Sequence, residues 1–125
     1  MSFQTRKRNS AVDALAPDGS EVRLLAATLR GSMAEFSLAP GMISKPVAHR
    51  TVEEVWVFVS GKGRIWRRHG DVEEVTDVEA GVSITIPVGT RFQFRSDGAE
   101  PLVAVGVTMP PWPGMDEAYE TEGKW

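Results

Sequence analysis

The sequence predicts an all-β protein, a sandwich or barrel of antiparallel strands, on three observations. Short apolar segments recur between turn signals at the spacing typical of such folds. No stretch keeps a helical period over about ten residues. No repeat or low-complexity tract divides the 125 residues, which suffice to bury one core. We therefore expect a single domain over 1–125, with an N-terminal arm (1–15), a barrel (16–109) and a C-terminal tail (110–125).

The expected strands follow one another along the chain with turns between them. The segment VRLLAAT (22–28) follows the turn sequence PDGS, and GSMAEFSLAPG (31–41) is its expected partner. The segment EEVWVFVS (53–60) is joined through GKG to RIWRR (64–68), which runs into the turn HGD. The remaining expected strands are EEVTDVE (73–79), VSITIP (82–87), TRFQFRS (90–96) and LVAVGVTM (102–109).

Charge and cysteine content exclude several classes of function. Fourteen Lys and Arg against seventeen Asp and Glu give a net charge of -3, which offers no basic face to nucleic acid or to a membrane surface. The absence of cysteine excludes disulfides, thiolate nucleophiles and thiolate zinc sites. The start of the chain lacks the apolar core of a signal peptide, and no later run is long enough to span a membrane. We therefore expect a cytoplasmic, soluble protein.

Residues 41–61 carry a spaced pattern of glycine, histidine and glutamate. Gly41 opens the segment and Gly61 closes it, and the spacing between them is that of the motif G-x5-H-x-H-x3,4-E-x6-G. His49 occupies the second histidine position and Glu54 occupies the glutamate position. Val47 stands where the motif has its first histidine.

Residues 81–96 fit a second motif, G-x5-P-x-G-x2-H-x3-N, at some of its positions and depart from it at others. Gly81, Pro87 and Gly89 match this motif, whereas Phe92 stands at its histidine position and Ser96 at its asparagine position. The two motifs are those of the cupin superfamily. The chain therefore resembles a cupin in scaffold while lacking half of the metal ligands.

This resemblance implies an antiparallel double-sheet jelly-roll β-barrel, which the eight expected strands suit. In cupins the two motifs lie on facing strands and point into one pocket. Cupins of this length are frequently homodimers, so the resemblance also implies a homodimer.

Alternation along each strand extends the expectation to neighbouring residues. If Glu54 points into the pocket, Trp56 does so as well. If Phe92 points inward, Phe94 follows, and Gln93 turns toward solvent with the other polar residues of its strand.

The chemistry of the expected pocket rests on His49 and Glu54. Cupins with three histidines and one glutamate commonly hold an ion such as Zn, Fe, Mn or Ni, which imidazole and carboxylate groups suit. Here Val47 and Phe92 stand at the other two ligand positions, and the chain has only two histidines. We therefore expect weak metal binding at most. The pair has three open interpretations: metal ligands, an acid and base acting on a bound organic molecule, or a buried structural hydrogen bond.

Three functions correspond to these interpretations. The first is a cupin barrel that binds a small organic molecule through His49 and Glu54 against an aromatic wall of Trp56 and Phe92, without a tightly held metal. The second is a weakly metallated cupin enzyme, an oxygenase or an isomerase, that uses His49 and Glu54. The third is a structural or regulatory dimer module whose barrel is filled.

Two further features concern the chain outside the motifs. The tail contains the sequence MPPWPG, which we expect to lay Trp112 over the barrel or over a partner subunit; a polyproline ligand for another domain is the alternative. His69 falls in the HGD turn, far from the motif residues, and is expected to be an exposed turn histidine.

Overall fold

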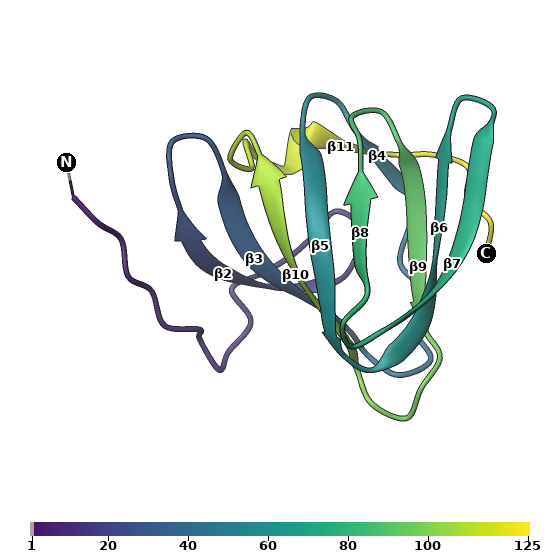
Figure 1. Ribbon diagram of the computed structural model, residues 1–125, viewed down its shortest axis with the longest axis horizontal. Helices are drawn as coiled ribbons and strands as arrows, with labels where there is room; N and C mark the ends of the chain where they lie inside the picture. The colour runs from purple at the N-terminus through teal and green to yellow at the C-terminus, as the bar shows by residue number, and fades with distance from the viewer. Residues whose placement is uncertain (1) are drawn as a thin grey trace.

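The computed structural model describes residues 2–125, and over this range eleven strands form two antiparallel sheets (Figure 1). The first sheet has the order β1-β2-β3-β10-β5-β8 and the second has the order β11-β4-β9-β6-β7. The strands of the first sheet are β1 (Ala14–Leu15), β2 (Glu21–Ala27), β3 (Ser32–Leu38), β10 (Leu102–Met109), β5 (Glu53–Ser60) and β8 (Ser83–Ile86). Those of the second are β11 (Ala118–Glu120), β4 (Val47–His49), β9 (Arg91–Ser96), β6 (Lys62–His69) and β7 (Val72–Glu79).

The fold is the antiparallel double-sheet jelly roll that the sequence predicts. From β3 onward the chain crosses from one sheet to the other at every connection except that between β6 and β7. The two sheets face each other across one core. The short connection between β5 and β6 requires Gly61, whose φ is 81°; a side chain there would also overlap the Pro101 carbonyl. No helix in the described part of the chain has the length and apolar character needed to cross a lipid bilayer.

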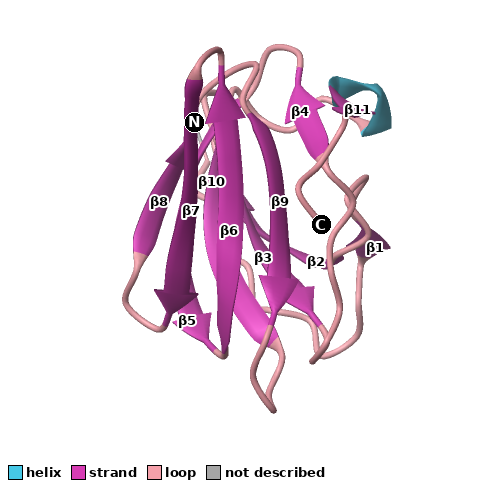
Figure 2. Ribbon diagram, turned by 90° about the vertical axis from the view of Figure 1, so that its right-hand side faces the viewer, coloured by secondary structure: helices cyan, strands magenta, loops and turns pink. Residues whose placement is uncertain are grey.

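All eight expected strands are present, and three shorter strands join them. The two segments that we expected to flank the barrel contribute β1 and β11, which pair with β2 and β4 respectively. A 3-10 helix, η1 (Met115–Glu117), precedes β11 and lies beside it in Figure 2. Strands of two or three residues carry no readable alternation, and their positions are fixed by the neighbours to which they bond.

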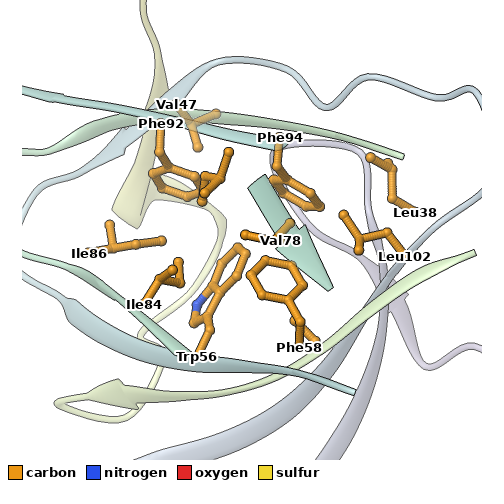
Figure 3. Packing of buried hydrophobic residues seen from close by; sticks show 12 residues of the cluster. Leu38, Val47, Trp56, Phe58, Val78, Ile84, Ile86, Phe92, Phe94 and Leu102 are labelled. Atoms are coloured by element: carbon orange, nitrogen blue, oxygen red, sulfur yellow. The ribbon is translucent and has the colours of Figure 1, made fainter. Parts of the chain in front are cut away.

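The core lies between the inner faces of the two sheets, where aromatic rings from opposite sides meet (Figure 3). Trp56 of β5 stands at the centre of this cluster. Its ring makes edge contacts with Phe58, Phe92 and Phe94 at centroid distances of 6.1, 5.8 and 5.4 Å. The inward direction predicted for Trp56, Phe92 and Phe94 is therefore confirmed.

Gln93 corrects one expectation, because its side chain is buried although it points away from the core. The tail crosses the outer face of β9 at this position. Gln93 Oε1 accepts hydrogen bonds from the backbone N–H groups of Lys124 and Trp125, and its amide nitrogen donates to the carbonyls of Ser44 and Trp125. Strand alternation therefore predicted the direction of the Gln93 side chain correctly. Its burial was not predicted, because it depends on the C-terminal tail that covers this face of β9.

Candidate functional site

A cavity of about 470 Å³ opens at the end of the barrel where β1, β2 and β3 of one sheet approach β4 and β11 of the other sheet and the adjoining helix η1. Exposed apolar side chains form its rim. Leu15 and Met115, for example, are 62 % and 61 % exposed. The base is formed by buried residues: Asp18, Val47, His49, Glu54, Trp56 and Phe92. The barrel interior is therefore accessible from one end, and the motif residues lie at the bottom of that opening.

His49 and Glu54 converge although they belong to opposite sheets. His49 ends β4 and Glu54 lies at the start of β5, so the three residues between the strands turn the chain from one sheet to the other. The backbone N–H groups of Thr51 and Val52 in this turn donate to the carboxylate of Glu117. With the turn fixed by these hydrogen bonds, His49 Nδ1 lies 3.3 Å from Glu54 Oε2.

The surroundings of this pair favour the uncharged form of both side chains. The side chains of His49 and Glu54 are 5 % and 3 % exposed. Burial lowers the pKa of His49 to about 4, although the nearby Glu117 carboxylate opposes the shift. Burial also raises the pKa of Glu54 to about 8, although the neighbouring Trp56 side chain opposes the shift; the charge of Asp18 adds a smaller contribution in the raising direction. Near neutral pH the pair is therefore an imidazole beside a protonated carboxyl group.

Two buried nitrogen atoms at the base have no hydrogen-bond partner among the described residues. They are His49 Nδ1 and Trp56 Nε1, which lie near the Glu54 carboxyl group without forming a hydrogen bond of good geometry to it. The contact between His49 and Glu54 has the distance of an ion pair without the geometry of a hydrogen bond. Unpaired buried polar groups are rare in folded proteins because each one has lost its water. The base of the cavity thus keeps capacity for hydrogen bonds that the protein itself does not use.

Asp18 is a site residue that the sequence did not indicate. It comes from the PDGS turn before β2, where an aspartate is ordinarily explained by the turn alone. Its Oδ1 atom accepts hydrogen bonds from the backbone N–H and the hydroxyl group of Ser20 at 2.9 and 2.7 Å. The residue is buried at the cavity, and this burial raises the pKa of its carboxyl group.

Aromatic rings from four parts of the chain surround the polar base. Trp56 and Phe92, the two rings expected in the wall, both line the cavity. Phe36 of β3 stacks on Trp56 with ring centroids 5.2 Å apart. Trp112 meets His49 edge-on at 5.2 Å, and Phe92 meets the same imidazole at 5.3 Å. The tail thus lays Trp112 over the barrel as expected, whereas no local signal in the sequence places Phe36 at the site.

The donor set does not fit a tightly held transition metal. His49 and Glu54 supply one nitrogen and one carboxylate, whereas catalytic zinc sites normally use three protein ligands. Val47 and Phe92, at the two remaining motif positions, are both 1 % exposed and fill that space with hydrocarbon. Among the described residues, no three His, Asp or Glu side chains come together in a way that would hold an ion. Any metal here needs donors from water or from a bound molecule.

A comparison with known protein families shows which family the chain belongs to. The model of the cupin domain family matches residues 34–108, which run from within β3 to within β10 and include both motif segments. This chain belongs to the cupin family. No curated protein matches it significantly.

Solved structures with the same fold come from proteins of different kinds. The capsular polysaccharide assembling protein CapF from Staphylococcus aureus has a TM-score of 0.72 at 24% sequence identity, over 94% of this cupin and 34% of CapF. An uncharacterised double-stranded β-helix protein from Klebsiella pneumoniae has a TM-score of 0.69 at 19% identity, over 95% and 91% of the two chains.

Oxalate decarboxylase from Bacillus subtilis, which has Mn(II) centres, has a TM-score of 0.70 at 18% identity, over 81% of this chain and 28% of its own. This cupin therefore matches only 34% of the length of CapF and 28% of the length of the decarboxylase. Sequence identities this low establish only the shared fold, so the chemistry of this chain has to be inferred from the residues of its own site.

Proposed function

We propose that this cupin binds a small organic molecule in the barrel cavity, with His49 and Glu54 holding its polar group against the wall of Trp56 and Phe92. The observation that supports the proposal is a cavity of about 470 Å³ with two unpaired buried nitrogens, His49 Nδ1 and Trp56 Nε1, among its lining residues. This volume lies within the range of small-molecule sites, which is about 300 to 1,000 Å³. A filled structural barrel would offer no such space.

The unpaired groups give a physical reason for a ligand to bind. Leaving a buried donor or acceptor unsatisfied costs about 1 to 3 kcal/mol, and a ligand group that completes the hydrogen bond recovers part of this free energy. The surrounding rings of Phe36, Trp56, Phe92 and Trp112 supply apolar area for the body of the molecule. The expected ligand therefore has an apolar or ring-shaped body and one polar group.

A fragment screen by ligand-detected NMR, followed by titration of tryptophan fluorescence, tests this proposal. We expect fragments of this description to bind the parent protein and to bind the double variant His49→Gln, Glu54→Gln at least about tenfold more weakly. The variant His69→Gln is the matched control, because His69 is exposed and lies outside the cavity. Unchanged fragment binding in the double variant, together with lowered stability, would show that the pair is a structural contact.

An isomerase that uses the pair as acid and base is the second candidate. The opposite pKa shifts of His49 and Glu54 leave a proton acceptor and a proton donor 3.3 Å apart at neutral pH, an arrangement suited to moving a proton on a bound substrate. Conversion of a bound fragment, followed by NMR, separates this candidate from simple binding.

The absence of a tightly held metal is a further part of the proposal, together with a cytoplasmic homodimer as the expected setting. Metal analysis of protein purified without an affinity tag tests the first part, and a stoichiometric transition metal would overturn it in favour of the metallated oxygenase. Light scattering coupled to size-exclusion chromatography tests the dimer.

A further inference from the structure

We propose that the cavity selects organic cations, namely small molecules in which an apolar body carries an ammonium group that sits between the carboxyl groups of Asp18 and Glu54 and the aromatic wall. This inference rests on the proposed function and adds to it the charge of the ligand.

The first argument is that the base holds two carboxyl groups, which become negatively charged when they lose their protons. Asp18 and Glu54 both line the cavity, and each is more than nine-tenths buried. They come from the turn before β2 and from β5, so the fold brings both to this cavity. Both side chains face the same cavity, and the charge of Asp18 contributes to the raised pKa of Glu54.

The second argument is that neither carboxyl group has a cationic partner. No Lys or Arg of the described chain lies within ion-pair distance of Asp18 or Glu54, and the only basic group near them is the uncharged His49 imidazole. Arg6 is the only Lys or Arg among the described residues of the lining, and it is an exposed residue near Asp13. A buried carboxylate without a counter-ion is unfavourable, so an ammonium group from a ligand would supply the missing partner.

The third argument is the aromatic surface beside these carboxyl groups. The negative faces of aromatic rings attract cations, most strongly in the case of tryptophan and in sites shielded from water. The lining brings Phe36, Trp56, Phe92 and Trp112 together at this end of the barrel. A carboxylate or phosphate ligand would instead meet two acidic groups and the faces of these rings.

Proton release should accompany the binding of a cation. An ammonium ion stabilises the ionised form of Glu54, so cation affinity should rise with pH through the range in which that side chain loses its proton. The other titratable or charged groups that face this region are Asp18, His49, Glu117 beside the imidazole and Arg6 at the rim. Of these groups, Asp18 acts in the same direction as Glu54, because loss of its proton also raises the affinity for a cation.

The test uses three probes that share a benzyl or phenyl body and differ in charge: benzyltrimethylammonium, benzyl alcohol and benzoate. Binding is measured by isothermal titration calorimetry at about pH 6 and at about pH 9, on either side of the Glu54 transition. We expect the cation to bind at least about tenfold more tightly than the alcohol at the higher pH, to weaken about tenfold or more at the lower pH, and benzoate to bind most weakly.

Two variants and one control assign the effect to the carboxyl groups. Glu54→Gln should weaken cation binding about tenfold, by more than it weakens binding of the alcohol, and should reduce the pH dependence of the cation affinity. Asp18→Asn should reduce cation affinity in the same direction and serves as a second variant if Glu54→Gln is poorly folded. Glu53→Gln, on the exposed neighbour of Glu54, should change nothing.

The outcomes separate this inference from the proposed function. Binding of the alcohol that depends on His49, with no preference for the cation, would overturn the inference and leave the proposed function standing. Benzoate binding as tightly as the cation would also overturn it. Absence of binding by all three probes at millimolar concentration would overturn both proposals for ligands of this size.

Discussion

The uncharged state of the His49 and Glu54 pair predicts an unusual dependence of stability on pH. The pKa of Glu54 is raised from 4.5 in the unfolded chain to about 8 in the folded protein. Its contribution to stability is therefore fully present below about pH 4.5 and is lost as the pH rises toward 8. The pKa of His49 is lowered from 6.5 to about 4. Its contribution is present above about pH 6.5 and is lost as the pH falls toward 4.

The two contributions cancel over part of the pH range. Between about pH 4.5 and 6.5 the unfolded chain holds its proton on His49 and the folded protein holds it on Glu54, so stability from the pair is constant. Above about pH 6.5 only the folded protein keeps this proton. Each pH unit then costs about 1.4 kcal/mol, which amounts to about 2 kcal/mol by pH 8.

Replacing Glu54 by Gln should reverse this profile. The variant lacks the Glu54 contribution but keeps that of His49, which should be constant above about pH 6.5 and should fall below it by about 1.4 kcal/mol for each unit, as His49 in the unfolded chain takes up a proton. Asp18 has the same direction of shift as Glu54, and comparison of parent with variant isolates the Glu54 contribution. The exposed Glu53→Gln variant should keep the parent profile.

Urea unfolding followed by tryptophan fluorescence at intervals from about pH 4.5 to 8.5 measures these free energies. An equal decline in parent and Glu54→Gln above about pH 6.5 would refute the assignment of the proton to Glu54. A parent protein whose stability falls steadily from pH 6.5 to 4.5 would show that the imidazole and the carboxyl group are not exchanging a proton in this way.

Three further predictions address packing and the tail. Gly106→Ala should destabilise the protein by about 1 to 3 kcal/mol in thermal or urea unfolding, because a Cβ there lies 2.6 Å from Trp56 Cδ1 and 2.9 Å from Phe36 Cε2. The control Gly98→Ala should be nearly neutral, because a Cβ at Gly98 lies 3.5 Å from its nearest neighbour, the backbone nitrogen of Lys62. Glu117→Gln should cost about 1 to 3 kcal/mol and speed proteolysis after Met109, because the carboxylate accepts hydrogen bonds from Thr51 and Val52. Trp112→Ala should raise the pKa of His49 from about 4 toward 6.5 in an NMR titration, because the indole shields the imidazole from water. An unchanged His49 titration would mean that other residues provide the burial.

Much of the fold was predictable because alternation along a strand is a local property. The strands β5 and β10 have the predicted bounds, and the inward direction of Trp56 and Phe92 followed from their spacing to the motif positions. The short strands β1, β4 and β11 were not predictable in this way, since two or three residues show no period. They exist because the strands beside them offer backbone groups for pairing: β2 for β1, β9 for β4 and β4 for β11.

The candidate site was predictable only where a motif marked it. Spacing singled out His49 and Glu54, and the fold brings these side chains to 3.3 Å across the two sheets. Asp18 and Trp112 reach the same cavity from the two ends of the chain, and neither belongs to a motif. Their contribution depends on how the flanking segments pack against the barrel, which no window of sequence contains.

The sequence by itself determined the double-sheet architecture, the family and the direction of each motif side chain, because strand period and motif spacing are set by covalent geometry. Only the tertiary structure decided which of these side chains are charged and what they face. Ionisation depends on water, and water is excluded at His49 and Glu54 by residues far apart along the chain. The same covering by the tail buried Gln93, whose position on the outer face of its strand predicted exposure.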